Sequence, residues 1–136
     1  MNYSHFVGLD VGKKSFDACL VSLDKELSHH TFPNTPGGIE ELLHRVKQRG
    51  VEVETALFCA ENMGSHVIDL CLSSYQFHFP LALGCPLTIK RSIGLQRGKN
   101  DRIDARRIAR YACLHYRKLR LYQLPDKDLV RLRNWR

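Results

Sequence analysis

The sequence lacks the features that define several protein classes. Its five cysteines form no Cys-x-x-Cys pair, and the chain has no internal repeat and no low-complexity tract. No stretch approaches the roughly 20 uncharged apolar residues of a membrane span, and the N-terminus lacks the basic-then-apolar layout of a signal peptide. We therefore expect a soluble cytoplasmic protein with reduced, mostly buried cysteines. A structural zinc site is the less favoured alternative.

Acidic residues are scarce in the last third of the chain. Residues 1–86 contain 6 Lys and Arg against 10 Asp and Glu, whereas residues 87–136 contain 15 against 4. The total charge of +7 is therefore the sum of −4 in the first part and +11 in the second. Such asymmetry indicates a polyanionic partner, and nucleic acid is the first candidate because each neutralised phosphate releases counterions. A solvated basic surface without a partner is the alternative.

Hydrophobic patterning predicts a single α/β domain. Apolar runs predict strands at 5–11, 15–23, 26–32, 53–61 and 76–83, and helical spacing predicts helices over 39–50 and 67–72. We expect the first three strands to be antiparallel, because short turns join them, and the last two to be parallel, because they follow helices. A basic connection over 84–99 then leads to a helix from about Asn100 to Arg117, with Asn100 or Asp101 as N-cap. The last residues look like an interrupted helix, so we expect the natural protein to continue beyond Arg136.

Two aspartates stand among basic residues in KNDRIDARRIARY, residues 99–111. On a helix, at about 100° per residue, Asp101 and Asp104 share a sector with the apolar residues of this segment. The arginines gather on the opposite side: Arg102, Arg106, Arg110 and Arg117. We therefore expect both acids to face the sheet, where a carboxylate needs a hydrogen-bonding role or a cation.

Asp10 and Glu61 stand at the ends of the first and fourth predicted strands. If these strands are neighbours, their carboxyl ends bring both acids to the place where Asp101 and Asp104 arrive. Four clustered carboxylates repel one another, and hard divalent cations such as Mg²⁺ compensate that repulsion. Two such ions can promote phosphoryl transfer. Taken singly, each acid has an ordinary interpretation as a helix cap, a favourable charge near a helix N-terminus, a turn residue or a loop acid.

Four motifs resemble one protein family. They are GLDVGKK at 8–14, Asn34-Thr35-x-x-Gly38, Glu61-x-x-Gly64 and, most specifically, KNDRIDA at 99–105. Together they resemble the DEDD-type, RuvC-like N-terminal domain of the insertion-sequence transposases that also include the Piv-type DNA invertases. The resemblance implies an RNase H-like fold over about residues 5–115 and basic C-terminal helices. It also implies a catalytic metal tetrad for two Mg²⁺ or Mn²⁺ ions: Asp10, Glu61, Asp101 and Asp104.

The resemblance further implies DNA recombination in a bacterial or archaeal cell. Residues 1–117 would form the catalytic domain, and residues 118–136 would begin a helical linker to a C-terminal domain that supplies a serine nucleophile. The chain would then hold the metal half of a composite site for DNA strand cleavage and transfer, and would not recombine DNA alone. Some members of the family are guided by a structured bridge RNA, so DNA, a guide RNA and further copies of the chain are the expected partners.

Basic side chains near these acids are candidates for phosphate contacts. They are Lys13, Lys14, Lys90, Arg91, Arg97, Lys99, Arg102, Arg106 and Arg110. Tyr111, Tyr116 and Tyr122 are candidates for stacking on unpaired bases, with helix packing favoured for Tyr116.

Two other classes of function compete with the recombinase hypothesis. In a non-catalytic nucleic-acid-binding and assembly module, the acids would be structural and the basic C-terminal third would bind the partner. In an actin-like ATPase, GLDVG would contact ATP phosphates, but that class requires a second glycine-rich phosphate loop, which the sequence lacks.

Overall fold

A five-stranded mixed sheet forms the centre of the computed structural model, which describes residues 3–23, 25–62, 64–84 and 101–123, without the side chains of 101–103. The strands are β1 (His5–Val11), β2 (Ser15–Ser22), β3 (Lys25–Pro33), β4 (Ala56–Glu61) and β5 (Leu81–Gly84). The α-helices are α1 (Pro36–Gln48), α2 (Ile68–Gln76) and α4 (Asp101–His115). Short 3-10 helices are η1 (Val53–Thr55), η2 (Gly64–Val67) and η3 (Tyr116–Lys118).

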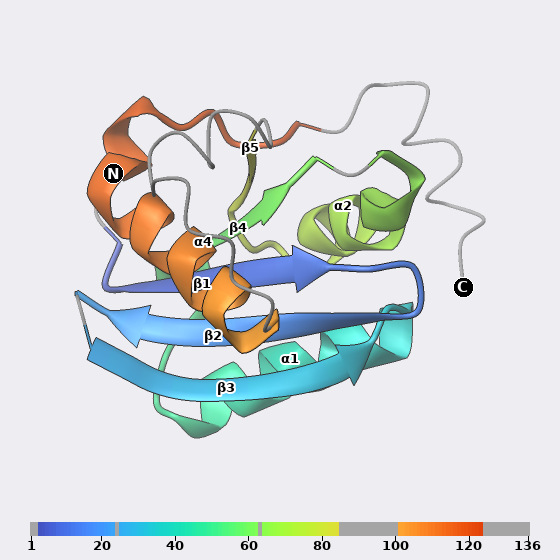
Figure 1. Ribbon diagram of the computed structural model, residues 1–136, viewed down its shortest axis with the longest axis horizontal. Coiled ribbons are helices and arrows are strands. Elements are labelled where there is room, and N and C mark those ends of the chain that lie inside the picture. The colour runs from blue at the N-terminus through green and yellow to red at the C-terminus, as the bar shows by residue number, and fades with distance from the viewer. Residues whose placement is uncertain (1–2, 24, 63, 85–100, 124–136) are drawn as a thin grey trace.

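The sheet order is β3-β2-β1-β4-β5. β1 and β2 are antiparallel, as are β2 and β3, whereas β4 is parallel to both β1 and β5. In Figure 1, α4 crosses one face of the sheet in front of β1 and β2, while α1 lies behind it. The predicted arrangement of three antiparallel strands followed by two parallel strands is confirmed.

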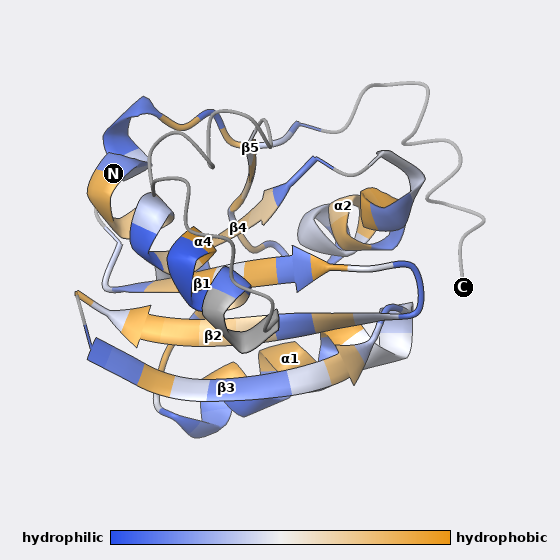
Figure 2. Cartoon of the chain, viewed as in Figure 1, coloured by the Kyte–Doolittle hydropathy of each residue, from blue (hydrophilic) through white to orange (hydrophobic). Residues whose placement is uncertain are grey.

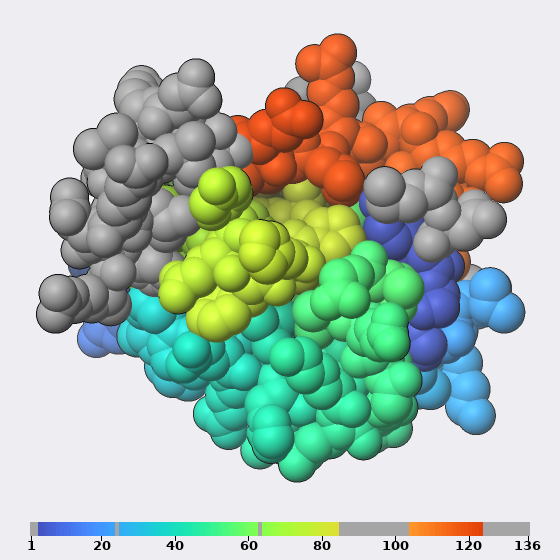
Figure 3. Space-filling view, turned by 180° about the vertical axis from the view of Figure 1, so that it is seen from behind, coloured from blue at the N-terminus to red at the C-terminus, as the bar shows by residue number. Residues whose placement is uncertain are grey.

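Helices cover both faces of the sheet, so the central strands are apolar on both sides. On one face, Val7, Leu9 and Phe58 pack against α1 and α2 in the larger hydrophobic cluster. On the other face, Phe6, Leu57 and the small residues of α4 form a second cluster. Figure 3 shows the first of these faces from outside, where α1 and α2 form the surface. Hydrophilic residues return on the outward side of α4 and along the edge strand β3 (Figure 2).

The start of α1 has a local explanation in the sequence. Thr35 is the N-cap, its Oγ1 accepts a hydrogen bond of 3.0 Å from the backbone N–H of Gly38, and Pro36 occupies the first turn. A Cβ on Gly38 would overlap the carbonyl oxygen of Pro33, so only glycine fits there. These contacts account for the Asn34-Thr35-x-x-Gly38 motif as helix-start chemistry.

The predicted fifth strand is wrong over its first half. Residues 68–76 continue as α2, and His78 turns the chain with a positive φ of 56°. Phe79 is buried against Phe58 with ring centroids 4.5 Å apart, so its hydrophobicity serves packing rather than strand pairing. The prediction also starts the fourth strand three residues too early, because Val53–Thr55 form a 3-10 helix and β4 begins at Ala56. Gly84, the first residue of the predicted basic connection over 84–99, ends β5, and the rest of that connection and Asn100 lie outside the described residues.

The backbone of α4 lies directly on β1 at Gly8. A Cβ at this position would overlap the carbonyl oxygen of Ala105 and the amide nitrogen of Ala109. Further along, Phe6 contacts the ring of Tyr116, with centroids 5.7 Å apart. Since Gly8 lies under the middle of α4 and Phe6 under its C-terminal end, α4 runs opposite to β1. The first turn of α4 therefore lies at the carboxyl end of β1.

Most of the described thiols are buried, as predicted. Cys19, Cys59 and Cys71 are buried and Cys113 is half-buried, whereas Cys85 lies outside the described residues. Burial raises the pKa of the Cys71 thiol to about 11, although a hydrogen bond with Tyr122 acts in the opposite direction. A buried thiol with a raised pKa carries little of the reactive thiolate at neutral pH.

We expect Gly8→Ala to lower the free energy of unfolding by about 2 kcal/mol or more, because the added methyl group cannot fit beneath α4. Urea unfolding measures the loss. Gly37→Ala is the matched control, since its Cβ would have only an ordinary contact of 3.9 Å with Thr35 Oγ1. A Gly8→Ala protein as stable as the wild type would contradict the close contact.

A thiol reagent at pH 8 should modify Cys113 much faster than Cys19, Cys59 or Cys71 in the native protein, because only Cys113 of these four is partly exposed. Peptide mapping by mass spectrometry after timed labelling checks the order. The same labelling in denaturant is the control and should remove the differences. Rapid native labelling of Cys59 would show that the interior is accessible.

Candidate active site

One row of residues across the sheet carries most of its acidic side chains. The register pairs Thr31 with Asp17 and Asp17 with Asp10, and on the other side it pairs Glu61 with Gly84. Asp10 and Glu61 directly follow the parallel pair Leu9 and Ala60, so they are neighbours on β1 and β4. We call Thr31, Asp17, Asp10, Glu61 and Gly84 the polar row.

The polar row faces α4. Side chains alternate along a strand, and Phe6 and Cys19 pack against α4, so Asp10 and Asp17 share that face. Glu61 also faces α4, because it lies two residues after Cys59, which packs against that helix. Burial and, to a smaller extent, the charge of Glu61 raise the pKa of the Cys59 thiol to about 12. The Cys59 thiol therefore stays neutral beside Glu61.

Asp104 approaches the row from α4. It is half-buried and directly precedes Ala105, which is fully buried against the sheet. Ile108 and Ala112 continue the same buried stripe, while Arg106, Arg110 and Arg117 are exposed. The predicted division of this helix into a sheet-facing and an arginine-bearing side is thus confirmed from Asp104 onward. Asp101 is the first residue of α4, and its side chain lies outside the described part.

The donors fit a hard divalent cation by their chemistry. Asp10, Glu61 and Asp104 offer carboxylate oxygens from two adjacent strands and from the helix that covers them, and such oxygens are the preferred ligands of Mg²⁺. Among the side chains that the structure describes, no three His, Cys, Asp or Glu lie close enough together to hold a metal ion. The shared face and the oxygen donors are the properties that match a metal site.

The loops at the carboxyl ends of β1 and β4 are tied together by Asn34. Its Nδ2 donates one hydrogen bond of 2.9 Å to the carbonyl of Gly12 and another of 2.9 Å to the carbonyl of His66. Gly12 follows β1 and His66 lies in η2 after β4, so one side chain fixes both loops beyond Asp10 and Glu61. Sequence patterning shows Asn34 only as turn chemistry, and the long-range contacts need the fold.

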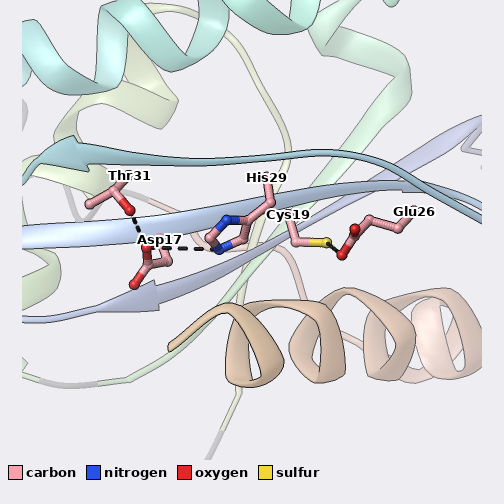
Figure 4. Close-up of polar contacts among 5 residues, drawn as sticks. All are labelled: Asp17, Cys19, Glu26, His29 and Thr31. Atoms are coloured by element: carbon pink, nitrogen blue, oxygen red, sulfur yellow. Dashed lines mark hydrogen bonds and ion pairs between the residues drawn. The ribbon is translucent and has the colours of Figure 1, made fainter. Parts of the chain in front are cut away.

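Asp17 is not among the predicted site residues, although it is the cross-strand partner of Asp10. Thr31 Oγ1 donates a hydrogen bond to Asp17 Oδ1, and His29 Nε2 lies 3.8 Å from the same oxygen. Figure 4 shows these side chains on the face of β2 and β3 that looks toward α4. The signal in the sequence is an acid inside the apolar run SFDACLVS.

The predicted phosphate contacts divide into three groups. Arg106 and Arg110 project from the outer side of α4, and Lys13 and Lys14 are exposed in the turn that follows β1. The side chain of Arg102 is outside the described part, as are Lys90, Arg91, Arg97 and Lys99. The prediction that Tyr111 stacks on bases is wrong, because its side chain is only 5% exposed. Tyr116 packs on Phe6 and Tyr3, as expected for helix packing.

The sheet order, the acids at the ends of β1 and β4 and the helix across them define a RuvC-like member of the RNase H-like class. Solved structures with the same fold include Thermus thermophilus RuvC in complex with a Holliday junction substrate, with a TM-score of 0.65 and 12% identity over 88% of this chain and 100% of that chain. A second Thermus thermophilus RuvC structure has a TM-score of 0.63 and 12% identity, and covers 87% of this chain and 99% of that chain. At this identity the likeness concerns the fold.

A family model for DEDD transposases of the IS110 type, described as "Transposase", matches residues 7–136. The chain belongs to this family, and the resemblance seen in its motifs is confirmed. The pilin gene-inverting proteins of Moraxella bovis and Moraxella lacunata are each 28% identical to it over 109 residues, which cover 78% of this chain and 33% of theirs. The chain thus spans about a third of the length of these relatives. No helix in the described residues is both long enough and apolar enough to cross a membrane.

We expect Asp10→Asn to raise the stability of the metal-free protein by about 0.5 kcal/mol, because like charges directly opposite on two strands destabilise a sheet. Urea unfolding in EDTA at low ionic strength measures the change. Asp69→Asn removes the same charge from the first turn of α2, a helix that packs on the opposite face of the sheet, and should not stabilise the protein. A stability gain of equal size in both variants would instead reflect total charge.

Proposed function

We propose that this chain is the metal-binding, RuvC-like half of a composite active site in a transposase or site-specific DNA recombinase. In this proposal, residues 1–117 form the catalytic domain, and residues 118–136 begin a helical linker to a further C-terminal domain. The supporting observation is the neighbouring placement of Asp10 and Glu61 on β1 and β4, with Asp104 on the covering helix.

The proposed metal ligands are Asp10, Glu61, Asp101 and Asp104. Mg²⁺ or Mn²⁺, as two ions, would supply the positive charge that stabilises the attacking and leaving oxygens of phosphoryl transfer. The protein holds two of the acids, Asp10 and Glu61, at the carboxyl ends of β1 and β4, and the other two at the start of α4. Asn34 keeps the loops beyond the two strand ends in place, which limits the movement of the acids before them.

The proposed nucleic-acid surface is the outer side of α4 with the adjoining basic residues. Arg106 and Arg110 are exposed there, and the first turn of α4 lies at the end of the sheet that carries the acids, so a phosphate backbone that follows this surface to the helix start would reach them. DNA is the substrate in this proposal. A structured guide RNA and further copies of the chain are the proposed partners, supported by the family relationship and by the charge of +11 in residues 87–136.

Titration of Mn²⁺ into the chain tests the metal proposal. We expect saturable binding by calorimetry and a higher melting temperature with Mn²⁺, because the ion removes repulsion among the acids. Asp10→Asn and the double variant Asp101→Asn, Asp104→Asn should both lose this binding. Asp69→Asn, which carries the same charge change as Asp10→Asn, should retain it. Equally weak binding in all four proteins would favour the non-catalytic nucleic-acid-binding module.

Salt dependence tests the proposed nucleic-acid surface. The affinity for duplex DNA should fall steeply with salt concentration, and replacing Arg102, Arg106 and Arg110 with glutamine should flatten the logarithmic slope by about 0.9 for each lost phosphate contact. The matched control replaces Arg45, Lys47 and Arg49, three exposed cations at the end of α1 on the opposite face. Equal effects of the two triple variants would contradict a specific role for α4. The same titration with structured RNA compares the two nucleic acids.

A further inference from the structure

Asp17 stands in the polar row, but it is not one of the four proposed metal ligands. It is only 7% exposed and, among the residues that the structure describes, it is the only buried acid. Its cross-strand partner is Asp10. Side chains of directly paired residues on adjacent antiparallel strands have Cβ atoms about 5 Å apart, so Asp17 is a close neighbour of the first proposed ligand.

The carboxylate of Asp17 is held from β3. Thr31 Oγ1 donates a hydrogen bond to Oδ1, and His29 Nε2 lies 3.8 Å from that same oxygen, which is longer than a hydrogen bond (Figure 4). The Nε2 atom of His29 is buried and has no hydrogen-bond partner among the described residues. The Thr31 hydroxyl and the His29 ring, both from β3, lie against Oδ1 of Asp17, and neither contact involves Oδ2.

These surroundings favour a cation near Asp17. Burying a carboxylate costs free energy, and Thr31 holds this one through a neutral hydroxyl. The opposite residue on β1 is another acid, which adds repulsion. A cation held by Asp10 would reverse the sign of that electrostatic interaction. Water on such a cation would also donate hydrogen bonds to Oδ2, the second carboxylate oxygen of Asp17.

We propose that Asp17 is a positioning residue of the metal site. Its carboxylate, fixed by Thr31, would accept hydrogen bonds from water on a cation held by Asp10 and would thereby strengthen cation binding. This inference rests on the proposed function, because it requires a cation at Asp10. It extends the site from β1, β4 and α4 to the antiparallel strands β2 and β3, which the four proposed ligands do not involve.

Two variants separate the charge of Asp17 from its orientation. Asp17→Asn removes the charge but keeps an oxygen that can accept the hydrogen bond from Thr31, so the local packing is preserved. Thr31→Val keeps the charge but removes the hydroxyl that orients it, and Thr31→Ser restores the hydroxyl. Asp69→Asn is the matched charge control away from the row. Circular dichroism and urea unfolding in EDTA report whether each variant folds.

The measurement is the dissociation constant of Mn²⁺ by calorimetry, with the electron paramagnetic resonance spectrum of bound Mn²⁺ as a second readout. We expect Asp17→Asn to weaken binding about tenfold, as removal of an outer hydrogen-bond partner does at metal sites. Thr31→Val should weaken it less and change the spectrum, Thr31→Ser should restore both, and Asp69→Asn should match the wild type.

The outcomes distinguish this inference from the proposed function. If Asp10→Asn loses Mn²⁺ binding while Asp17→Asn and Thr31→Val retain wild-type affinity and spectra, Asp17 has only a structural role and the inference is wrong. If Thr31→Val alone weakens binding and Thr31→Ser does not restore it, the loss comes from packing, which also counts against the inference. If the wild type and Asp10→Asn bind Mn²⁺ equally, both the proposed function and the inference fail.

Discussion

The contact between α4 and β1 at Gly8 is the constraint on which the rest of the structure depends. The helix backbone rests on the strand without an intervening side chain, and alanines at 105 and 109 complete the fit. This close approach sets the height of α4, and the contact between Phe6 and Tyr116 further along fixes its direction. Because the helix runs opposite to β1, its first turn, with Asp101 and Asp104, lies at the strand end that carries Asp10. Packing and the candidate chemistry therefore share one geometric cause.

The two faces of the sheet have different roles. The face covered by α1 and α2 is apolar from β3 to β5, with Leu9, Ile39 and Phe58 fully buried there. The face covered by α4 is apolar only as far as Phe6, Cys19 and Leu57 extend, and it then changes to the polar row. The larger cluster supplies stability that can offset the repulsion among the acids. Such a division allows a site that is unfavourable by itself to persist in a stable domain.

The charge pattern of the chain matches this arrangement. The acids of the polar row come from the first 86 residues, and the helix that covers them comes from the basic last third. Within α4, the sheet-facing side carries Asp104 with Ala105 and Ile108, while the outer side carries Arg106 and Arg110. A polyanion attracted to the outer side would be brought near the acids without pairing them with arginine. The outer side of α4 can thus attract a phosphate backbone, while the sheet-facing side carries an acid that can bind a cation.

Much of the fold and part of the candidate site follow from local sequence patterns. Apolar runs and short turns predict β1, β2 and β3, helical spacing predicts most of α1, and the same spacing places Asp104 with the buried residues of α4. The first half of the predicted fifth strand is wrong because alternation of Phe77, Phe79 and Leu81 also suits the end of a helix and a packed turn. Asp10 and Glu61 can be recognised as candidate ligands from the sequence, because each is an acid near the end of an apolar run.

The sequence by itself determined which segments are apolar, where α1 begins, which side of the last helix carries acids and which family the motifs resemble. Only the tertiary structure decided that Asp17 stands opposite Asp10, that Asn34 ties the loops after β1 and β4, and that Gly8 lies under α4. The physical reason is that strand register and helix docking join residues far apart in the chain. Local propensity and periodicity describe neighbours along the chain, whereas these contacts depend on how whole elements pack.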